Sequence, residues 1–158
     1  MAVEVKLDVI IEALEMADDS ISSYLDVETG EVYAITEEEF DLAEDPQTAI
    51  EDLPNWQREA VKLAQSIQEQ DGKRYLALPS KFDVHEWAIM DSFSMTLRDA
   101  QMRNDFHGGI RGAGAFRLFK YLLTEYNLWD AWNRFKQVEL RQMAIQWCEE
   151  NGITFRQA

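Results

Sequence analysis

Apolar residues recur three and four positions apart at the start of the chain, which predicts an amphipathic helix over residues 4–19. This stripe consists of Leu7, Ile10, Ile11, Leu14 and Ala17. Two β-rich runs follow within residues 21–35, on either side of Gly30, and this pattern predicts a hairpin. Gly30 supplies the positive φ that the turn requires. A single hairpin is marginal in water, so residues 74–79 are expected to add a third strand.

Capping signals mark the helices that follow. Thr36 stands three residues before Glu39, which predicts a capping box at the start of a short acidic helical turn. Pro54 is expected to open the next helix, because its fixed φ suits a first helical position. The predicted apolar face of that helix comprises Trp56, Ala60, Leu63 and Ile67. Asp83 and Glu86 form a second predicted capping box, here at the start of a single helix.

The last part of the chain is predicted to be helical around a glycine-rich connector. Residues 107–114 hold four glycines and are expected to form this flexible connector. Helical periodicity returns over residues 116–126 and again over residues 128–150. Gly152 follows the last predicted helix and precedes an apolar residue, which predicts a Schellman stop.

These elements predict an α+β fold. A small antiparallel sheet of about three strands, the hairpin plus one strand, is expected to pack with an N-terminal helix and a helix-rich C-terminal half. The length of 158 residues fits a single domain. We expect that domain to span residues 1–158, with an acidic half over 1–80 and a helical half over 81–158. A hydrophobic content of 46% supplies enough apolar material for its core.

Charge is distributed unevenly along the chain. The net charge is −15, yet residues 1–72 carry 20 acidic against three basic residues, whereas residues 73–158 carry 10 acidic and 12 basic ones. One interpretation is a solvated face that keeps the protein in solution. The other is a surface for a basic protein partner, of which imitation of nucleic acid is a special form. The acidic half would repel phosphates, which argues against nucleic-acid binding there.

The candidate residues of a partner surface are acids between the hairpin turn and the helix that Pro54 opens. They are Glu28, Glu31, Glu37, Glu38, Glu39, Asp41, Glu44, Asp45, Glu51 and Asp52. Their spacing does not predict whether they share one contiguous surface.

A second candidate site is the glycine-rich connector, because backbone N–H groups and nearby cations suit a phosphate or a carboxylate. Its candidate ligand-binding residues are His107, Gly108, Gly109, Arg111, Gly112, Gly114, Arg117 and Lys120. The spacing fits neither a dinucleotide-binding fingerprint nor a P-loop. The alternative is structural: the glycines permit a tight crossing of two helices, with Phe116 and Phe119 in the core.

Basic residues of the last helices form a third candidate surface. Arg134 and Arg141 are seven residues apart and share a helix face, and with Arg117 and Lys120 they make a basic strip. Nucleic-acid binding through this strip is one interpretation, and ordinary solvated charge is the other.

Catalytic and metal chemistry finds no support in the sequence. No histidine, cysteine or carboxylate spacing typical of a metal site occurs, and no nucleophile stands in a catalytic motif. Cys148 lies near a helix C-terminus beside Glu149, which raises the pKa of its thiol and predicts an unreactive, packed cysteine. We therefore expect no catalytic residue, no metal and no cofactor, and the balance leans against an enzyme.

The sequence also indicates a compartment. No stretch approaches the roughly 20 apolar residues that a membrane span needs. The first residues lack the basic and apolar regions of a secretory signal. The lone Cys148 excludes an internal disulfide framework. We expect a soluble, cytoplasmic protein with no membrane partner.

Three stretches resemble uncharacterised protein family 0158, a bacterial group. Residues 24–32, Tyr-Leu-Asp-Val-Glu-Thr-Gly-Glu-Val, are similar to its opening motif. Residues 112–120 are similar to its Gly-Arg-Gly-Ala-Phe-Arg-Arg-Phe-Lys, although Leu118 stands where that pattern has a second Arg. The tail from Leu128 to Ile153 continues the resemblance. The resemblance implies an α+β fold and brings no established activity with it.

The function that the sequence favours is a non-enzymatic, acidic interaction module that binds a basic protein. One alternative is a protein, enzymatic or not, that binds phosphate, a nucleotide or another small anion through the loop from Gly108 to Gly114. A second alternative is nucleic-acid binding through the basic C-terminal helices. The sequence does not predict the oligomeric state.

Overall fold

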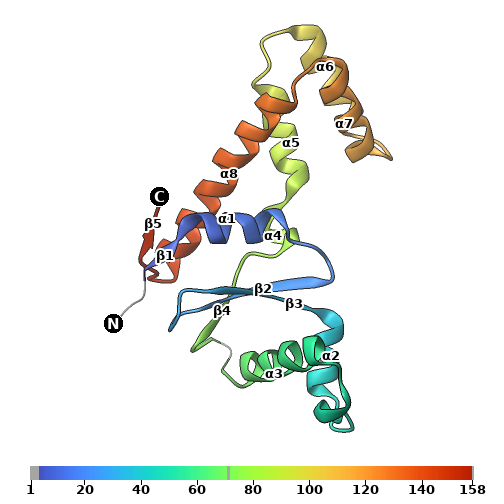
Figure 1. Ribbon diagram of the computed structural model, residues 1–158. Coiled ribbons are helices and arrows are strands. Elements are labelled where there is room, and N and C mark those ends of the chain that lie inside the picture. The colour runs from blue at the N-terminus through green and yellow to red at the C-terminus, as the bar shows by residue number, and fades with distance from the viewer. Residues whose placement is uncertain (1–3, 71, 158) are drawn as a thin grey trace. The chain divides into compact units, whose positions relative to one another are not determined.

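The computed structural model describes residues 4–70 and 72–157, and the chain forms two compact units (Figure 1). The first unit combines the residues up to Asp83 with those from Met143 onward, and the second unit spans Val84–Gln142. That the chain forms a single domain with halves 1–80 and 81–158 stays a prediction. Among the described residues, no helix has the length and apolar character needed to cross a bilayer.

A three-stranded antiparallel sheet organises the first unit. Its strands are β2 (Ile21–Asp26), β3 (Val32–Thr36) and β4 (Tyr75–Ala77), in the order β3-β2-β4. Gly30 has a φ of 80°, so the turn between β2 and β3 uses the left-handed backbone that glycine adopts without strain. The structure confirms the predicted hairpin and its third strand.

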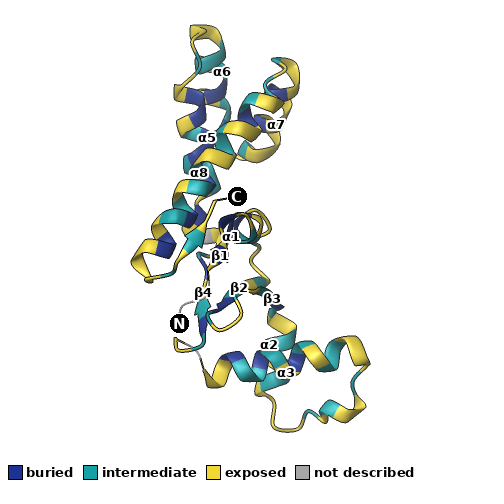
Figure 2. Ribbon diagram, turned by 60° about the vertical axis from the view of Figure 1, so that its left-hand side comes forward, coloured by how far each residue is buried: buried dark blue, intermediate teal, exposed yellow. Residues whose placement is uncertain are grey.

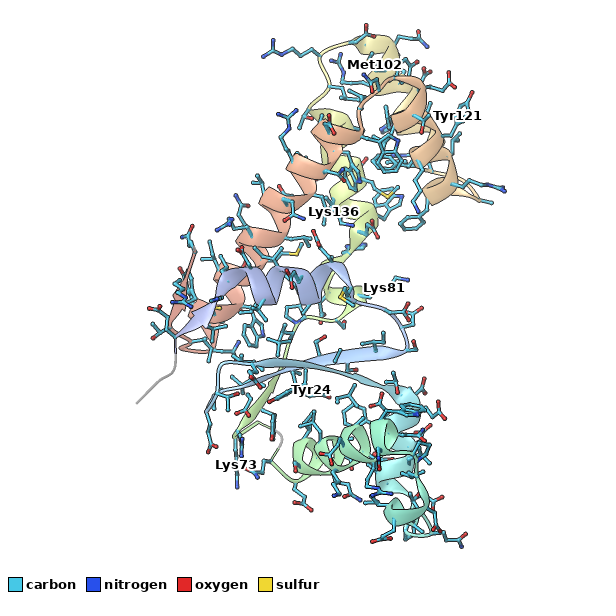
Figure 3. All side chains as sticks on the ribbon, viewed as in Figure 1. Tyr24, Lys73, Lys81, Met102, Tyr121 and Lys136 are labelled. Carbon is cyan, nitrogen blue, oxygen red and sulfur yellow. The ribbon has the colours of Figure 1, made fainter. Side chains whose placement is uncertain are left out.

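Helices cover both faces of this sheet (Figure 1). α1 (Leu7–Glu15) lies on one face, and α2 (Glu37–Glu44) lies with α3 (Asn55–Glu69) on the other. The side toward α2 and α3 is built on a buried cluster of Ile35, Ala64, Ile67 and Tyr75. Tyr24 packs against this cluster and points to the same side of the sheet (Figure 3). The sheet therefore has an apolar layer on each face.

The predicted starts of α2 and α3 are confirmed. Thr36 Oγ1 accepts a 3.1 Å hydrogen bond from the backbone N–H of Glu39, and Pro54 immediately precedes α3. The predicted apolar face of α3 is wrong in part, because Trp56 is 75% exposed. Its buried residues are Val61, Ala64 and Ile67. Two apolar stripes overlap on this helix and share Ile67, and packing against the sheet selects the stripe that includes Val61 and Ala64.

The first helix is shorter than its predicted span of 4–19. The residues before α1 form β1 (Val5–Lys6), which pairs in parallel with β5 (Phe155–Arg156). After α1, the Asp18 carboxylate accepts a 2.9 Å hydrogen bond from the backbone N–H of Ser20, which turns the chain toward β2. The sequence could not reveal the pairing of β1 with β5, because each is a two-residue strand and shows no alternation.

The second unit is a set of helices around an aromatic core. Its helices are α5 (Glu86–Met95), α6 (Ala100–Gly109), α7 (Ala115–Glu125) and the first part of α8 (Trp129–Glu150), which continues into the first unit. The ring of Phe93 lies at the centre of the core. It makes edge contacts, with centroids 5.4 to 6.3 Å apart, with Phe106, Phe119, Trp132 and Phe135.

The predicted capping box of Asp83 and Glu86 is wrong. Asp83 lies inside a short helix, α4 (Lys81–Val84), and its backbone N–H donates to Ser80 Oγ at 3.2 Å. The Asp83 carboxylate in turn accepts a 2.9 Å hydrogen bond from the backbone N–H of Ser80. His85, with a φ of 54°, then interrupts the single predicted helix before α5 begins. The cap therefore stands three residues earlier than predicted.

The glycine-rich connector is also shorter than predicted, because residues 107–109 belong to α6. The Asp99 carboxylate caps this helix by accepting hydrogen bonds from the backbone N–H groups of Gln101 and Met102. The burial of Phe106 stabilises the helix further. Together these interactions offset the low helix propensity of the two glycines at its end.

The last two predicted helices are confirmed as α7 and α8. The predicted Schellman stop after α8 is present too: Gly152 has a φ of 66°. The backbone N–H of Ile153 donates to Cys148 O at 2.8 Å, and that of Gly152 donates to Glu149 O at 3.3 Å. These are the two hydrogen bonds of that motif.

A buried ion pair fixes the hairpin against β4. Asp26 is only 1% exposed and accepts hydrogen bonds from Arg74 Nε at 3.1 Å and Arg74 Nη2 at 3.0 Å. Its carboxylate also accepts from the backbone N–H of Glu28 at 2.9 Å, inside the turn. Burial by itself raises the pKa of Asp26, but the hydrogen bonds from Arg74 and Glu28 and the charge of Arg74 outweigh it, so the pKa lies below its ordinary value.

We expect Asp26→Asn to lower the free energy of unfolding by about 2 kcal/mol near neutral pH, because it leaves the Arg74 guanidinium without its buried partner. Since the pKa of Asp26 is lowered in the folded state, the ionised carboxylate stabilises the fold above the unfolded pKa of about 4, and this contribution is lost as the pH falls below that value. Urea unfolding of both proteins from pH 7 down to pH 3 measures the difference.

The matched control is Glu28→Gln, since Glu28 contacts the same guanidinium at 3.2 Å but its side chain is 64% exposed. An exposed pair contributes less than about 1 kcal/mol. Equal losses from the two substitutions, or a difference that does not shrink at low pH, would contradict the role given to Asp26.

Candidate functional site

Glycines at the end of α6 and in the loop before α7 allow a close crossing of the two helices. A Cβ atom added to Gly109 would lie 3.0 Å from Leu118 Cδ2, which is tighter than ordinary van der Waals contact. Gly114, with a φ of 76°, precedes the first residue of α7. Gly108 and Gly112 have open space where a side chain would be. The structural interpretation of the glycines therefore applies to Gly109 and Gly114. Of the two phenylalanines that it placed in the core, Phe119 is buried, but Phe116 is exposed, so that part is wrong for Phe116.

Arg111 is held by neighbours within the second unit. Its Nη2 atom lies 3.3 Å from Asp91 Oδ1, and Nη1 donates to His107 O at 3.0 Å. The guanidinium also lies over the ring of Trp87, 5.5 Å from its centroid. Trp87 Nε1 donates to Ile110 O at 2.7 Å, so this group of residues ties the loop after α6 to α5. An anion at Arg111 would have to compete with Asp91.

Arg117 is the cation that the structure places beside the loop glycines. An open hollow of about 380 Å³ is lined by Ala113, Gly114, Arg117, Leu118 and Tyr121. Tyr121 is 56% exposed and stands out from α7 in Figure 3. His107 and Lys120 are exposed and do not line the hollow. The structure thus brings together Gly114 and Arg117 from the eight candidate residues, in an open site with no deeply buried polar side chain in its lining.

The acidic candidates fall into two groups. Glu28 and Glu31 flank the hairpin turn at one end of β3, and the others follow the opposite end of β3. Glu28 pairs with Arg74, and Glu31 accepts a 2.6 Å hydrogen bond from Tyr33 Oη. A strand rises about 3.3 Å per residue, so Glu31 and Glu37 lie about 20 Å apart. The candidates therefore do not form a single cluster.

The second group lies on α2 and on the segment that leads to α3, which includes the 3-10 helix η1 (Ile50–Asp52). Its exposed members are Glu37, Glu38, Asp41, Glu44, Asp45, Glu51 and Asp52, and we call them the α2 acidic surface. Figure 2 shows this segment exposed over most of its length. Within residues 4–70 and 72–157, no ion pair involves any of these carboxylates. Glu39 is half-buried and bonds to Thr36 Oγ1.

Arg58 stabilises the segment beside the α2 acidic surface without neutralising its carboxylates. Its Nη2 atom donates to two backbone carbonyl oxygens, Glu51 O at 2.9 Å and Leu53 O at 3.1 Å. Gln68 Nε2 donates to the Glu44 carboxylate at 3.1 Å and holds α2 near α3. The Arg58 guanidinium and the Gln68 amide therefore position the segment, and neither forms an ion pair with a carboxylate of the α2 acidic surface.

The basic residues of the last two helices are only partly available. Arg134 is exposed, but its Nε atom donates to Asp130 O at 3.4 Å. Lys136, labelled in Figure 3, pairs with Glu86 at 3.1 Å and lies 6.0 Å from the centroid of the Trp132 ring. These contacts are typical of basic side chains that stabilise the fold. Nucleic-acid binding through the strip stays a prediction.

Cys148 has the character that the sequence predicts. Its side chain is buried, and the pKa of the thiol is raised to about 11, first by burial and then by the charge of Glu149. In the part of the chain that the structure describes, no three histidine, cysteine or carboxylate side chains gather as metal ligands.

The sequence did not predict a groove that lies beside the edge of the sheet. It lies between α1 and β3, has a volume of about 150 Å³, and is lined by Val9, Glu12, Ala13, Met16, Ile21, Ser23, Val32 and Ala34. Met16 is 68% exposed beside it. A signal exists in the sequence: Val32 and Ala34 alternate along β3, and the small Ala34 leaves room on that face. The spacing alone could not show that α1 lies opposite them.

Substitutions at the two adjacent glycines of α6 test the close helix crossing. Gly109→Val places its side chain against Leu118, whereas Gly108→Val enters open space. Both variants carry the same change in helix propensity, so their difference isolates the contact. We expect Gly109→Val to be less stable than Gly108→Val by about 1 kcal/mol, measured by chemical unfolding. Equal stability would show that Leu118 moves aside without cost.

Comparison with known proteins confirms the family that the sequence resembles. The profile of the uncharacterised protein family UPF0158 matches residues 2–158. A UPF0158 protein of Pseudomonas aeruginosa is 25% identical over 146 residues, which cover 90% of this chain and 82% of that protein. No solved structure matches the chain. The match over almost the whole length, together with the hairpin and loop motifs now placed in the fold, shows that this chain belongs to the uncharacterised protein family UPF0158.

Proposed function

We propose that this protein is a non-enzymatic interaction module whose α2 acidic surface binds a basic segment of another protein. One observation carries the proposal: the surface presents seven exposed carboxylates, and none of them has an ion-pair partner among the described residues. Two like charges 4 Å apart in water repel by about 1 kcal/mol, so crowded carboxylates gain when a cationic segment approaches. The same field raises the association rate of a basic partner.

The surroundings of this surface support a binding role more than a catalytic one. A candidate active site requires convergent polar groups in a concave, partly dry site. The carboxylates of the α2 acidic surface lie exposed on a helix and its adjoining segment rather than in an enclosed, concave site. Imitation of nucleic acid is one special form of the proposed binding.

A charge-neutralising triple variant tests the proposal. Asp41→Asn, Glu44→Gln and Glu51→Gln remove three charges from the surface and leave the first turn of α2 unchanged. We expect the affinity for a lysine-rich peptide to fall roughly tenfold, since each exposed pair contributes about 0.5 kcal/mol. Fluorescence anisotropy at about 0.01 M and about 0.15 M salt should also show weaker binding at the higher concentration, because screening shortens the range of the field.

The control carries Glu69→Gln, Glu125→Gln and Glu150→Gln, three exposed residues outside the α2 acidic surface with the same change in net charge. Its affinity for the peptide should stay within about twofold of that of the unaltered protein. The same loss in both variants would show that net charge alone attracts the peptide. Affinity that does not change with salt would reject an electrostatic surface altogether.

The hollow beside Arg117 supports a second candidate function, the binding of a phosphate or another small anion. Gly114 and Arg117 line the same open hollow, which is the observation in its favour. A ligand that binds only the folded state raises the melting temperature. If the candidate is right, inorganic phosphate or ATP raises the melting temperature of this protein and not that of Arg117→Ala. Arg134→Ala is the control, because Arg134 is equally exposed and lies outside the hollow.

A further inference from the structure

The hydrogen-bond pattern of the sheet determines which backbone groups of β3 face outward. The backbone N–H of Asp26 donates to Glu31 O and that of Glu37 donates to Ser20 O, both in register with the pairing of Tyr24 with Tyr33. Hydrogen-bonded pairs alternate along an antiparallel ladder. The even-numbered residues of β2 therefore bond to the odd-numbered residues of β3. It follows that Val32 and Ala34 direct their N–H and C=O groups to the outer edge, and Thr36 directs its N–H there.

The pairing of β2 with β4 confirms which residues of β2 bond to β3. Val27 N–H donates to Arg74 O at 2.9 Å, and Leu78 N–H donates to Ser23 O at 2.9 Å. The odd-numbered residues of β2 thus bond to β4, as the even-numbered residues bond to β3. β2 is thus paired on both sides, and the sheet has two outer edges, one on β3 and one on β4.

The two edges differ in how they are protected. On β4, Tyr75 O accepts from the backbone N–H of Gly72 at 3.0 Å, and Ala77 O accepts from Trp147 Nε1 at 3.2 Å. On β3, no described residue bonds to the outward backbone groups of Val32 and Ala34 or to the outward N–H of Thr36, whereas the C=O of Thr36 belongs to the start of α2. The strand also lacks the proline or lysine that commonly blocks an exposed edge. The edge of β3 is thus available for a further strand.

The side chains along this edge favour an apolar residue on one face. Val32 and Ala34 point to the side of α1, where they line the groove of about 150 Å³ with Val9 and Met16. A hollow of this size accepts roughly one benzene-sized group. A strand added to β3 would direct every second side chain toward this groove and the alternate ones toward the side on which α2 lies.

Charge selects the occupant of the edge. Glu31 and Glu37 stand at its two ends, and both are exposed and without an ion pair among the described residues. A second copy of this chain that paired antiparallel about Ala34 would place Glu31 opposite Glu37, and like charges in opposed positions are destabilising. A basic strand is favoured by the same carboxylates.

We propose that the edge of β3 binds an extended segment of a basic partner as an added antiparallel strand, with alternate apolar side chains in the groove and alternate basic side chains toward the α2 acidic surface. This inference rests on the proposed function and specifies its geometry: backbone hydrogen bonds would supply affinity, and the groove would supply selectivity.

Amide hydrogen exchange with a short synthetic peptide of alternating Lys and Val tests the geometry. Protection of the Val32, Ala34 and Thr36 amides should rise at least about tenfold on binding, whereas Tyr33 and Ile35 should change little because they are already bonded to β2. In the matched peptides, N-methylation of the Val residues should abolish binding, since their N–H groups face β3. N-methylation of the Lys residues should leave it intact.

Ala34→Pro tests the same edge from the side of the protein. The substitution removes an N–H that points outward and breaks no bond to β2, so proline is tolerated there as on other edge strands. We expect at least about a tenfold loss of peptide affinity with nearly the same melting temperature. If the variant does not fold, the N-methylated peptides alone decide whether the peptide bonds to β3 through its backbone.

The outcomes separate the two proposals. Salt-weakened peptide binding that falls in the α2 triple variant, but without protection of β3 and without an effect of N-methylation, would overturn the added strand and leave the acidic interaction surface standing. The absence of any salt-dependent binding would overturn both. Protection of Val32, Ala34 and Thr36 without peptide, rising with protein concentration, would identify a second copy of the chain as the occupant and overturn the basic partner.

Discussion

The pairing of β2 with two neighbours is the constraint on which the rest of the first unit depends. Its even-numbered residues bond to β3 and its odd-numbered residues bond to β4, so the central strand is paired on both sides. The same alternation sends Leu25 to the side of α1 and Tyr24 to the side of α2 and α3. It also leaves one edge open. The buried pair of Asp26 and Arg74 holds this arrangement at the turn.

This arrangement gives a physical meaning to the motif that first indicated the family. Asp26 and Gly30 belong to the stretch of residues 24–32, and both are structural: one carries the buried charge and the other the left-handed turn. The glycine-rich stretch of residues 112–120 is structural in part as well, since Gly114 precedes the first turn of α7. Features that look like a site in the sequence therefore contribute to the fold. The surfaces that carry the proposals lie beside them, on α2 and along β3.

Much of the fold could be predicted from local signals. The turn at Gly30, the cap at Thr36 and the stop at Gly152 depend on one residue and its near neighbours, and all three are confirmed. One error is local, because the cap predicted at Asp83 stands at Ser80. Other errors occur where tertiary packing decides. Trp56 lies on a helix with two apolar stripes, and the sheet selects between them. The groove and the open edge depend on strand phase and on the position of α1, which no local pattern encodes. The division of the acidic residues likewise depends on the path of β3.

The most direct test of the account is amide hydrogen exchange of the free protein along β3, measured residue by residue. If the backbone N–H groups of the even-numbered residues of β3 face solvent, the amides of Val32, Ala34 and Thr36 exchange much faster than those of Tyr33 and Ile35. This alternation persists at low protein concentration. Uniform protection along β3, or protection of the even-numbered amides, would contradict the strand phase. The available edge and the added strand would then have no basis.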